Sequence, residues 1–317
     1  MKELAPIVVF VYNKLEETTK MMEALMNNTL AKESELFVFS DGPKSADGKN
    51  AVEEVRTYIH SNRIVEAFRT VTIAEAEQNK GLAESVITGV TQIMNRFGKV
   101  IVVEDDLVTS PCFLDYMNKA LQYYESDESI WSVTGFSYGM PMPNGYGHDV
   151  FIHGRVSSYG WGTWKDRWDT VDWEVKTYPK FKHNFFERFQ MGRWGSNLPE
   201  MLDAQMLSDI DSWAIRWCYS AIKQKKMTVY PVVSKIRIVD NSGNAHHGKV
   251  PSAFTDIVID EHVTTCDKME KVHLNREIVR LFNKLSPGKS KRNKIRWAII
   301  RITGVKYNSD FFKILRI

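Results

Sequence analysis

Residues 100–116 read VIVVEDDLVTSPCFLDY and carry the clearest structural signal of the chain. The four apolar residues 100–103 are followed at once by the acids Glu104-Asp105-Asp106, called here the acidic triplet. An unbroken run of β-branched residues indicates a strand buried on both faces, as in a parallel sheet. Ser110 and Pro111 are typical of the N-cap and the first position of a helix. We therefore expect a buried strand that ends in three acids, with a helix shortly after it.

The same alternation of strand and helix is found upstream. Apolar runs at residues 7–12, 36–40 and 68–73 predict three further strands, and residues 15–26 and 82–97 each have one apolar helical face. Downstream, residues 128–135 and 227–233 indicate strands and residues 209–225 a helix. Repeated strand–helix units predict an α/β fold with a mostly parallel sheet flanked by helices.

Composition and missing motifs exclude several classes of protein. No apolar run approaches the ~20 residues of a membrane-spanning helix, and Met1 is not followed by a secretory signal, so a cytoplasmic location is expected. The three cysteines include no CxxC pair, which favours packed thiols over disulfides or zinc. Neither G-x-G-x-x-G nor a P-loop follows the first strand, which argues against dinucleotide-dependent dehydrogenases and P-loop enzymes. A phosphatase of the haloacid dehalogenase type would carry two acids where the chain has Tyr12-Asn13-Lys14.

Acidic residues follow two of the predicted strands. Ligands of open parallel sheets bind beyond the carboxyl ends of the strands, where Asp41 and the acidic triplet are expected. Three adjacent acids repel one another, and a divalent cation would offset that repulsion. Carboxylate oxygens suit Mg²⁺ or Mn²⁺, both of which keep positions for waters and substrate phosphates. The alternative is a solvated acidic turn beside a helix N-terminus.

Residues 102–116 closely resemble the strand, acidic motif and helix of N-acetylglucosaminyltransferase I and its GT-A relatives. Further motifs occur in the order of that family: Ser40-Asp41-Gly42, Asn79-Lys80-Gly81-Leu82, Tyr159-Gly160-Trp161-Gly162 and Asp211-Ser212-Trp213. The resemblance implies a GT-A fold with an elaborated acceptor side. We expect a nucleotide-sugar-binding half at residues 1–135, an acceptor half of the same domain at 136–250, and a helical extension at 251–317.

The resemblance also implies roles for single residues. Asp41 would bind the uracil or ribose of the donor, and Asp106 would be the direct metal ligand. His246 is a weaker metal candidate in the polar loop 241–248, although most loop histidines bind nothing. Trp161, Trp164 and Trp168 have the spacing of a core stripe, and Trp161, beside two glycines, is the one expected at the sugar. The residues expected on the donor are Lys14, Asp41, Asn79, Glu104, Asp105, Trp161 and His247.

The catalytic base is expected at Asp211. Transfer to a hydroxyl requires a carboxylate that accepts its proton. The family often has two acids ahead of the tryptophan, whereas here Asp209 and Asp211 flank Ile210, so Asp209 is the alternative base. A second reading makes Asp211 the N-cap of the following helix.

Together these features predict a metal-dependent glycosyltransferase that uses Mn²⁺ or Mg²⁺. The resemblance implies inversion, although a retaining enzyme can use the same fold. The expected donor is a UDP-sugar, with UDP-GlcNAc as one candidate, and the expected acceptor is a glycan or a lipid-linked sugar in surface polysaccharide synthesis. The alternatives are a noncatalytic protein that binds sugar nucleotides or glycans, and a nucleotidyltransferase of related fold.

The tail carries most of the excess positive charge. Residues 289–317 contain nine Lys or Arg against the single acid Asp310, and Trp297 stands among apolar residues. This composition suits an anionic membrane surface, and it predicts peripheral binding at the inner face of the cell membrane. A docked C-terminal helix with a solvated basic face is the alternative. No nucleic-acid recognition motif accompanies the basic cluster, so nucleic acid is not an expected partner.

Overall fold

The structure is a computed structural model that describes residues 3–238, 257, 259 and 268–285 of the 317-residue chain. In these ranges the strands are β1 (Ile7–Val11), β2 (Glu35–Ser40), β3 (Thr70–Glu75), β4 (Lys99–Glu104), β5 (Leu107–Thr109), β6 (Ile130–Thr134), β7 (Val150–His153), β8 (Trp161–Trp164), β9 (Met227–Pro231) and β10 (Ile236–Ile238). The α-helices are α1 (Leu15–Met26), α2 (Lys49–Ile59), α3 (Asn62–Val65), α4 (Leu82–Phe97), α5 (Phe113–Tyr123), α6 (Lys165–Trp168), α7 (Tyr178–Phe181), α8 (Phe185–Gly192), α9 (Leu198–Met206), α10 (Trp213–Lys223) and α12 (Arg276–Leu285). Short 3₁₀ helices lie at Ala31–Glu33 and Ala46–Gly48.

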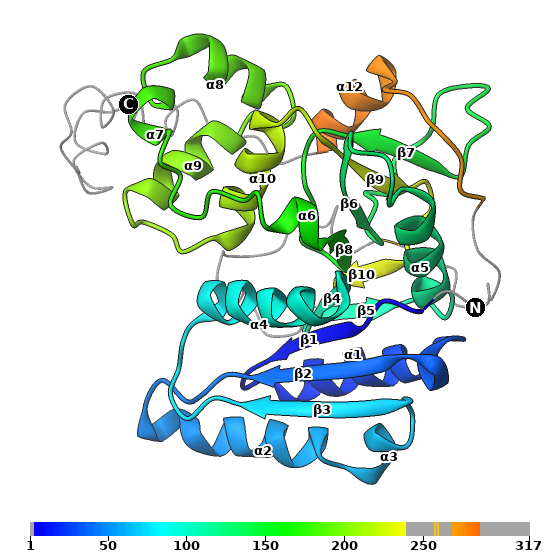
Figure 1. The fold of residues 1–317 in the computed structure, drawn as a ribbon, viewed down its shortest axis with the longest axis vertical. Coiled ribbons are helices and arrows are strands. Elements are labelled where there is room, and N and C mark those ends of the chain that lie inside the picture. Colours follow the sequence, from blue (N-terminus) through cyan, green and yellow to red (C-terminus); the bar gives the residue numbers. More distant parts are fainter. Residues whose placement is uncertain (1–2, 239–256, 258, 260–267, 286–317) are drawn as a thin grey trace.

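Eight of these strands form one sheet in the order β3-β2-β1-β4-β8-β6-β9-β7 (Figure 1). The neighbours from β3 to β4 pair in parallel, as do β6 and β9, whereas β8 runs antiparallel to both β4 and β6. Helices connect the parallel strands β1 to β4 along the chain. The predicted α/β fold with a mostly parallel sheet is therefore confirmed.

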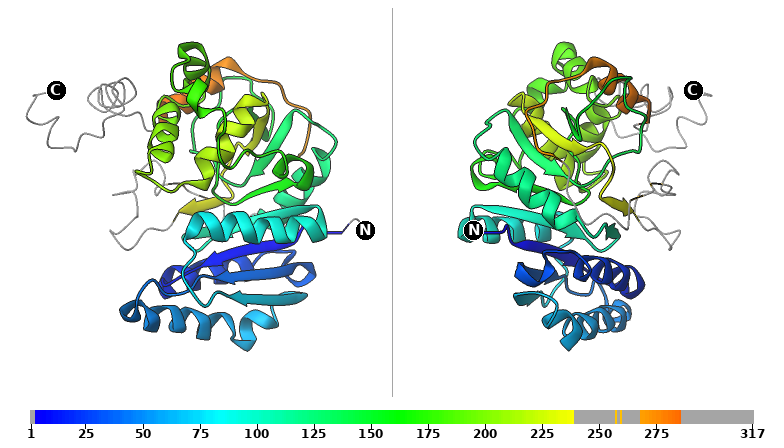
Figure 2. Two further views of the ribbon diagram at one scale, coloured as in Figure 1. Left: turned by 60° about the vertical axis from the view of Figure 1, so that its left-hand side comes forward. Right: turned by 90° about the vertical axis from the view of Figure 1, so that its right-hand side faces the viewer.

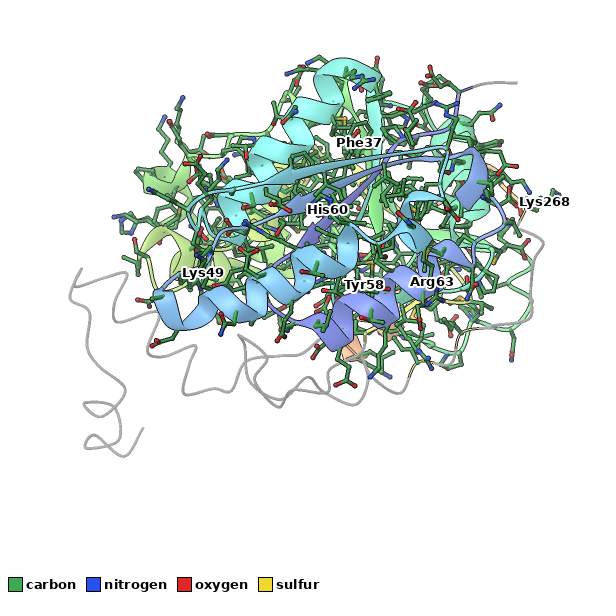
Figure 3. All side chains as sticks on the ribbon, turned by 90° about the horizontal axis from the view of Figure 1, so that it is seen from below. Phe37, Lys49, Tyr58, His60, Arg63 and Lys268 are labelled. Atoms are coloured by element: carbon green, nitrogen blue, oxygen red, sulfur yellow. The ribbon has the colours of Figure 1, made fainter. Side chains whose placement is uncertain are left out.

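Helices cover both faces of the first four strands. Along β1, Ile7 and Val9 pack in a core with residues of α1, α2 and α5, whereas Val8 and Phe10 pack in a core with α4. This alternation follows from the strand geometry, because successive side chains point to opposite faces. Figure 3 shows the strands between α4 on one side and α1 and α2 on the other, with Phe37 on the α4 side. All of β1 is buried, as its apolar sequence predicted.

The region after the acidic triplet differs from expectation. The helix begins at Phe113, with Cys112 at its N-cap, and not at Pro111. The strand β5 lies between the triplet and the helix and pairs antiparallel with β10, while the amide of Ser110 donates to the carbonyl oxygen of Lys235 at 2.8 Å. Because β10 is more than 120 residues away in sequence, no local pattern could predict this pairing.

Two further expectations concern the thiols and the membrane. Cys112 and Cys218 are buried free thiols, which confirms the packed-thiol interpretation for these two, and Cys266 lies outside the described residues. Within the described ranges, the helices are too short or too polar to cross a membrane. The basic tail, residues 289–317, lies outside the described residues.

Candidate active site

The first four strands end side by side at one edge of the sheet. In the pairing register Phe10 of β1 lies beside Phe39 of β2 and Glu104 of β4, and Phe39 lies beside Ala74 of β3. Asp41 follows β2 directly, and the acidic triplet begins with the last residue of β4. The parallel crossovers therefore bring two acidic segments, separated by about sixty residues of sequence, to the same edge.

The carboxylate of Asp41 is held by four donors of the protein. Its Oδ1 accepts from the amides of Gly42 and Lys80, both at 2.9 Å. Its Oδ2 accepts from the amide of Gly81 and from Nδ2 of Asn79, both at 3.0 Å. An ionised carboxylate offers about four acceptor positions, so these donors occupy its capacity. In this geometry Asp41 joins the loop after β2 to the turn before α4. The predicted direct contact of Asp41 with uracil or ribose would have to replace one of these four hydrogen bonds.

The contact between the loop after β2 and the turn before α4, called here the junction, is tightly packed. A Cβ on Gly42 would lie 2.5 Å from the backbone carbon of Gln78, so only glycine allows the two loops to approach this closely. From below, Arg56 donates through Nη2 to the carbonyl oxygen of Ala76 at 2.7 Å and through Nε to Oγ of Ser40 at 3.3 Å. Asn79 also donates to the carbonyl oxygen of Gly42 at 2.8 Å, so it belongs to the junction and not to an open surface.

Burial and mutual repulsion shift the titration of the acidic triplet. Desolvation raises the pKa of Glu104 well above its usual range, and the charges of Asp106 and Asp105 raise it further. Desolvation, with a contribution from Asp106, raises the pKa of Asp105 to about 7. Lys14 is close enough to lower the Asp105 pKa and Glu17 close enough to raise it. The predicted residues Lys14, Glu104, Asp105 and Asp106 thus form one electrostatic cluster with an excess of negative charge.

The excess of acidic over basic side chains in this cluster raises the question of a bound divalent cation. In the part of the chain that is described, no group of three or more His, Cys, Asp or Glu side chains is arranged to hold a metal ion. Mg²⁺ and Mn²⁺ sites in nucleotide enzymes often need only one or two carboxylates, because substrate phosphates supply the other ligands. The raised pKa values mean that ionising Glu104 and Asp105 is unfavourable in the ligand-free protein. A cation would favour the ionised forms, so the triplet fits a site that substrate phosphates complete.

The histidine candidates cannot be placed. His246 and His247 lie outside the described residues. Strand β10, which precedes them, ends at Ile238, opposite Leu107 in the register. Ile238, the last described residue before the two histidines in this part of the chain, therefore pairs with the residue that follows Asp106.

Tyr159, close to the triplet, and Arg155, close to Tyr159, were not among the site residues predicted from the sequence. Burial raises the pKa of the Tyr159 hydroxyl, and the charges of Tyr138, Asp106 and Glu104 raise it further, which places Tyr159 close to the acids. Arg155 lies close enough to lower the same pKa, and its Nη1 donates to Oδ1 of Asn197 at 2.9 Å. The only indication of Tyr159 in the sequence was its place in the motif Tyr159-Gly160-Trp161-Gly162. No motif contained Arg155.

Trp161 does not lie at an open surface, so its predicted contact with the sugar is wrong. The side chain is fully buried, and its ring packs 4.4 Å from that of Trp217 and 5.2 Å from that of Trp213, centroid to centroid. Trp164 and Trp168 are 2% exposed, so the burial that the core-stripe interpretation predicted is confirmed. The three rings form no helical stripe, because Trp161 and Trp164 lie on the strand β8 and Trp164 packs in the opposite core from Trp161 and Trp168. Trp161 pairs with Val102 across the sheet, and therefore links β4, just before the triplet, to the start of α10.

The predicted base lies at that start of α10. The side chain of Asp211 is 70% exposed, and its Oδ1 lies 3.3 Å from Nη2 of Arg216. The N-cap of α10 is Ser212, whose Oγ accepts from the amide of Ile215 at 3.3 Å, so the capping interpretation of Asp211 is wrong. Asp209 is also exposed, three residues before the cap. Both carboxylates are accessible to an acceptor.

Residues 1–153 match the GNT-I family. The chain thus resembles GNT-I, as the motifs predicted, over a match slightly shorter than half its length. The GNT-I-like part contains Asp41 and the acidic triplet, but it ends before Trp161 and Asp211. No curated protein matches the chain.

Solved glycosyltransferase structures show only distant similarity. A mannosyltransferase, PcManGT from Pyrobaculum calidifontis in complex with GDP-Man and Mn²⁺, matches with 16% identity and a TM-score of 0.30, over 41% of this chain and 34% of that chain. TarS from S. aureus matches with 14% identity and a TM-score of 0.36, over 54% and 30%. Its 1–349 fragment matches with 12% identity and a TM-score of 0.40, over 73% and 60%. The chain spans less than two thirds of the length of each.

Proposed function

We propose that the protein is a metal-dependent glycosyltransferase that moves a sugar from a nucleotide-diphosphate donor to a hydroxyl group. The observation that carries the proposal is the acidic triplet at the carboxyl edge of a parallel sheet, with the pKa values of Glu104 and Asp105 raised by burial and repulsion. The GNT-I match over residues 1–153 supports the same class of reaction. A site that accumulates uncompensated carboxylates suits a cation with a bound diphosphate.

The donor half has a division of roles in this proposal. Asp106 would hold Mn²⁺ or Mg²⁺ together with the donor phosphates, and a metal bound there would neutralise the departing diphosphate as a Lewis acid. Glu104 and Asp105 face the ribose and the sugar, and Lys14 balances the charge beside Asp105. Asp41 acts indirectly, because its four hydrogen bonds hold the turn that contains Asn79 and Lys80.

The acceptor half supplies the base. Asp211 is exposed and precedes the helix whose Trp213 packs on Trp161, and Trp161 in turn pairs with Val102 beside the triplet. This chain of contacts couples the position of α10 to the strand that carries the acids. Asp211 accepts the proton of the attacking hydroxyl, and Asp209 is the alternative for this role.

The finer features rest on the resemblance. We propose a UDP-sugar donor, with UDP-GlcNAc as the first to test, inversion at the anomeric carbon, and an acceptor that is a glycan or a lipid-linked sugar of a surface polysaccharide. His247 is kept as a candidate contact of the diphosphate and His246 as a candidate metal ligand. A peripheral position at the membrane, through the basic tail, completes the proposal.

Two variants separate binding from chemistry. Asp106→Ala should weaken donor binding and turnover together, and should remove the extra thermal stabilisation that UDP provides with Mn²⁺ over chelator. Asp211→Asn should lower turnover by about 10²-fold or more while donor affinity stays near normal. Asp209→Asn is the matched control, because it removes an exposed carboxylate two residues away and should leave turnover unchanged.

Calorimetry with UDP-GlcNAc and a radiolabel transfer assay measure these quantities. A parent protein that binds the donor but releases only products of hydrolysis, or none, with every acceptor class would indicate a noncatalytic binding protein. Loss of turnover in Asp209→Asn with none in Asp211→Asn would move the base to Asp209.

A further inference from the structure

Three phenylalanines of α8 lie on the surface of the protein. Phe185, Phe186 and Phe189 are 84%, 67% and 58% exposed, and we call them the α8 patch. A phenylalanine side chain buries roughly 150–250 Å² when covered, so the patch leaves several hundred Å² of aromatic surface in water. That is near the upper end of the largest apolar patch on a typical monomer, which marks the patch as a candidate interaction site.

The helix beneath the patch is firmly held, so the outward position of these rings is built into the fold. On its inner face, the guanidinium group of Arg188 donates to both carboxylate oxygens of the fully buried Asp203, each at 2.8 Å. The same guanidinium group lies over the ring of Phe181, 5.2 Å from its centroid. At the N-terminus, Oδ1 of Asn184 accepts from the amide of Glu187 at 3.1 Å.

The patch stands in a basic setting. Residues 176–193 contain five Lys or Arg and one acid, Glu187. Arg188 is paired with the buried Asp203 and Lys176 with Glu174, which leaves three cations around the patch. Glu187 is already matched, because its Oε2 lies 3.1 Å from Nζ of Lys223. The cationic side chains beside the patch remain at the surface: Lys180 and Arg193 are exposed and Lys182 is half-buried.

We propose that α8 docks the protein on a membrane that contains anionic lipid, with the patch in the boundary between headgroups and acyl chains. Interfacial helices combine large apolar side chains on one face with Lys and Arg beside them, and anionic lipid attracts the cations. The helix lies at the end of the long axis opposite α2, and it stays at that end in both further views (Figures 1 and 2).

Charge favours the membrane over a second copy of the chain. A second copy of the chain in a two-fold contact would bring Lys180, Lys182 and Arg193 against the same cations of the partner, because such a contact joins identical surfaces. The proposal uses residues of the acceptor half only, and it is independent of the proposed activity and of the tail.

The test compares the full-length protein with Phe185→Ser/Phe186→Ser/Phe189→Ser in flotation with vesicles of phosphatidylcholine, with and without one fifth phosphatidylglycerol. The parent should bind the anionic vesicles, and the triple variant about tenfold or more weakly. Lys180→Glu/Lys182→Glu should weaken binding to anionic vesicles only. Val65→Ser is the matched control, because Val65 is 47% exposed on α3, and it should bind like the parent.

Hydrogen exchange locates the contact. Anionic vesicles should slow amide exchange in residues 185–192 of the parent, and the triple variant should keep its thermal stability and its response to UDP. Equal vesicle binding by parent and triple variant would refute the docking role of α8, as would unchanged exchange in 185–192. A parent dimer that the triple variant converts to a monomer, without vesicle binding by either, would assign the patch to self-association and overturn the proposal.

Discussion

Replacing Asp41 by asparagine tests whether this residue acts on the donor directly or through the turn before α4. The carboxylate accepts four hydrogen bonds, three from backbone amides and one from Asn79. Asparagine keeps the shape, but only its carbonyl oxygen accepts, and its NH₂ group would face two donors. At least two charge-assisted hydrogen bonds are then lost, at ~1.5 kcal/mol each, which gives a destabilisation of about 3 kcal/mol.

This loss should be visible without any ligand. At ~2 °C per kcal/mol for a chain of this size, Asp41→Asn should lower the Tm of the ligand-free protein by about 6 °C. Exchange of the Lys80 and Gly81 amides should accelerate, since both donate to Asp41. Calorimetry and hydrogen exchange measure the two effects. Asp47→Asn is the control, because it removes the same charge from an exposed position in the neighbouring loop.

Asn79→Ala separates the junction from a donor contact. Asn79 and Asp41 share a hydrogen bond, so the destabilisation of the double variant should fall short of the sum of the single variants. Donor affinity should fall in both single variants in proportion to the loss of the turn. If Asp41→Asn keeps the ligand-free Tm and its amide protection but loses donor affinity, Asp41 contacts the donor and our assignment of an indirect role is refuted.

Three further predictions concern pH and packing. The folded-state pKa of Asp105, about 7, lies above its ordinary value, so its contribution to stability is complete below pH ~4 and is lost as pH rises through 7. Between pH 4 and pH 7 the parent should therefore lose of order 4 kcal/mol of unfolding free energy. Asp105→Asn should abolish this loss, as measured by denaturant titrations at the two pH values. The pKa of buried His153 is lowered to about 3, so its contribution is complete above pH ~6.5 and falls by ~3 kcal/mol on acidification to pH 4.5. These slopes oppose each other, so His153→Gln should make the protein more stable at pH 4.5 than at pH 6.5, whereas equal stability at both would contradict the assignment. Gly42→Ala should lower both Tm and donor affinity because its Cβ would collide with the backbone of Gln78, and an unchanged Tm would show that the loop relaxes freely.

How much of the site was predictable depends on the range of the interactions. The four strand ends were predicted within a few residues, because each strand is a local apolar run and parallel crossovers bring the carboxyl ends to one edge. Lys14 follows from the same argument, since it ends the loop after β1, and the structure places it near Asp105. The sequence could not predict which groups donate hydrogen bonds to Asp41, because its partners at 79–81 are brought to it only by the pairing of β2 with β3.

After residue 135, fewer features could be predicted from the sequence. The spacing of the tryptophans predicted burial but also a helical stripe, whereas Trp161 lies on the strand β8. Local glycines suggested an open position for Trp161, and only the packing of β8 against α10 shows that it is buried. The residue that caps α10 is determined by its backbone angles, and Ser212, not Asp211, is the N-cap and has the extended conformation. The exposure of the α8 patch was equally hidden, because Phe181 and Phe189 are the same residue type in one short segment, and one is 1% and the other 58% exposed.

The amino-acid sequence alone was enough to predict the α/β class, six of the eight strands of the large sheet and the acids that follow β2 and β4, because these depend on local hydrophobic runs and on the order of elements along the chain. The tertiary structure decided which side chains are accessible, which hydrogen-bond acceptors are already occupied, and how far each carboxyl pKa departs from its ordinary value. Those quantities depend on neighbours far away in sequence, through burial and through distances between charges, and no local pattern encodes them.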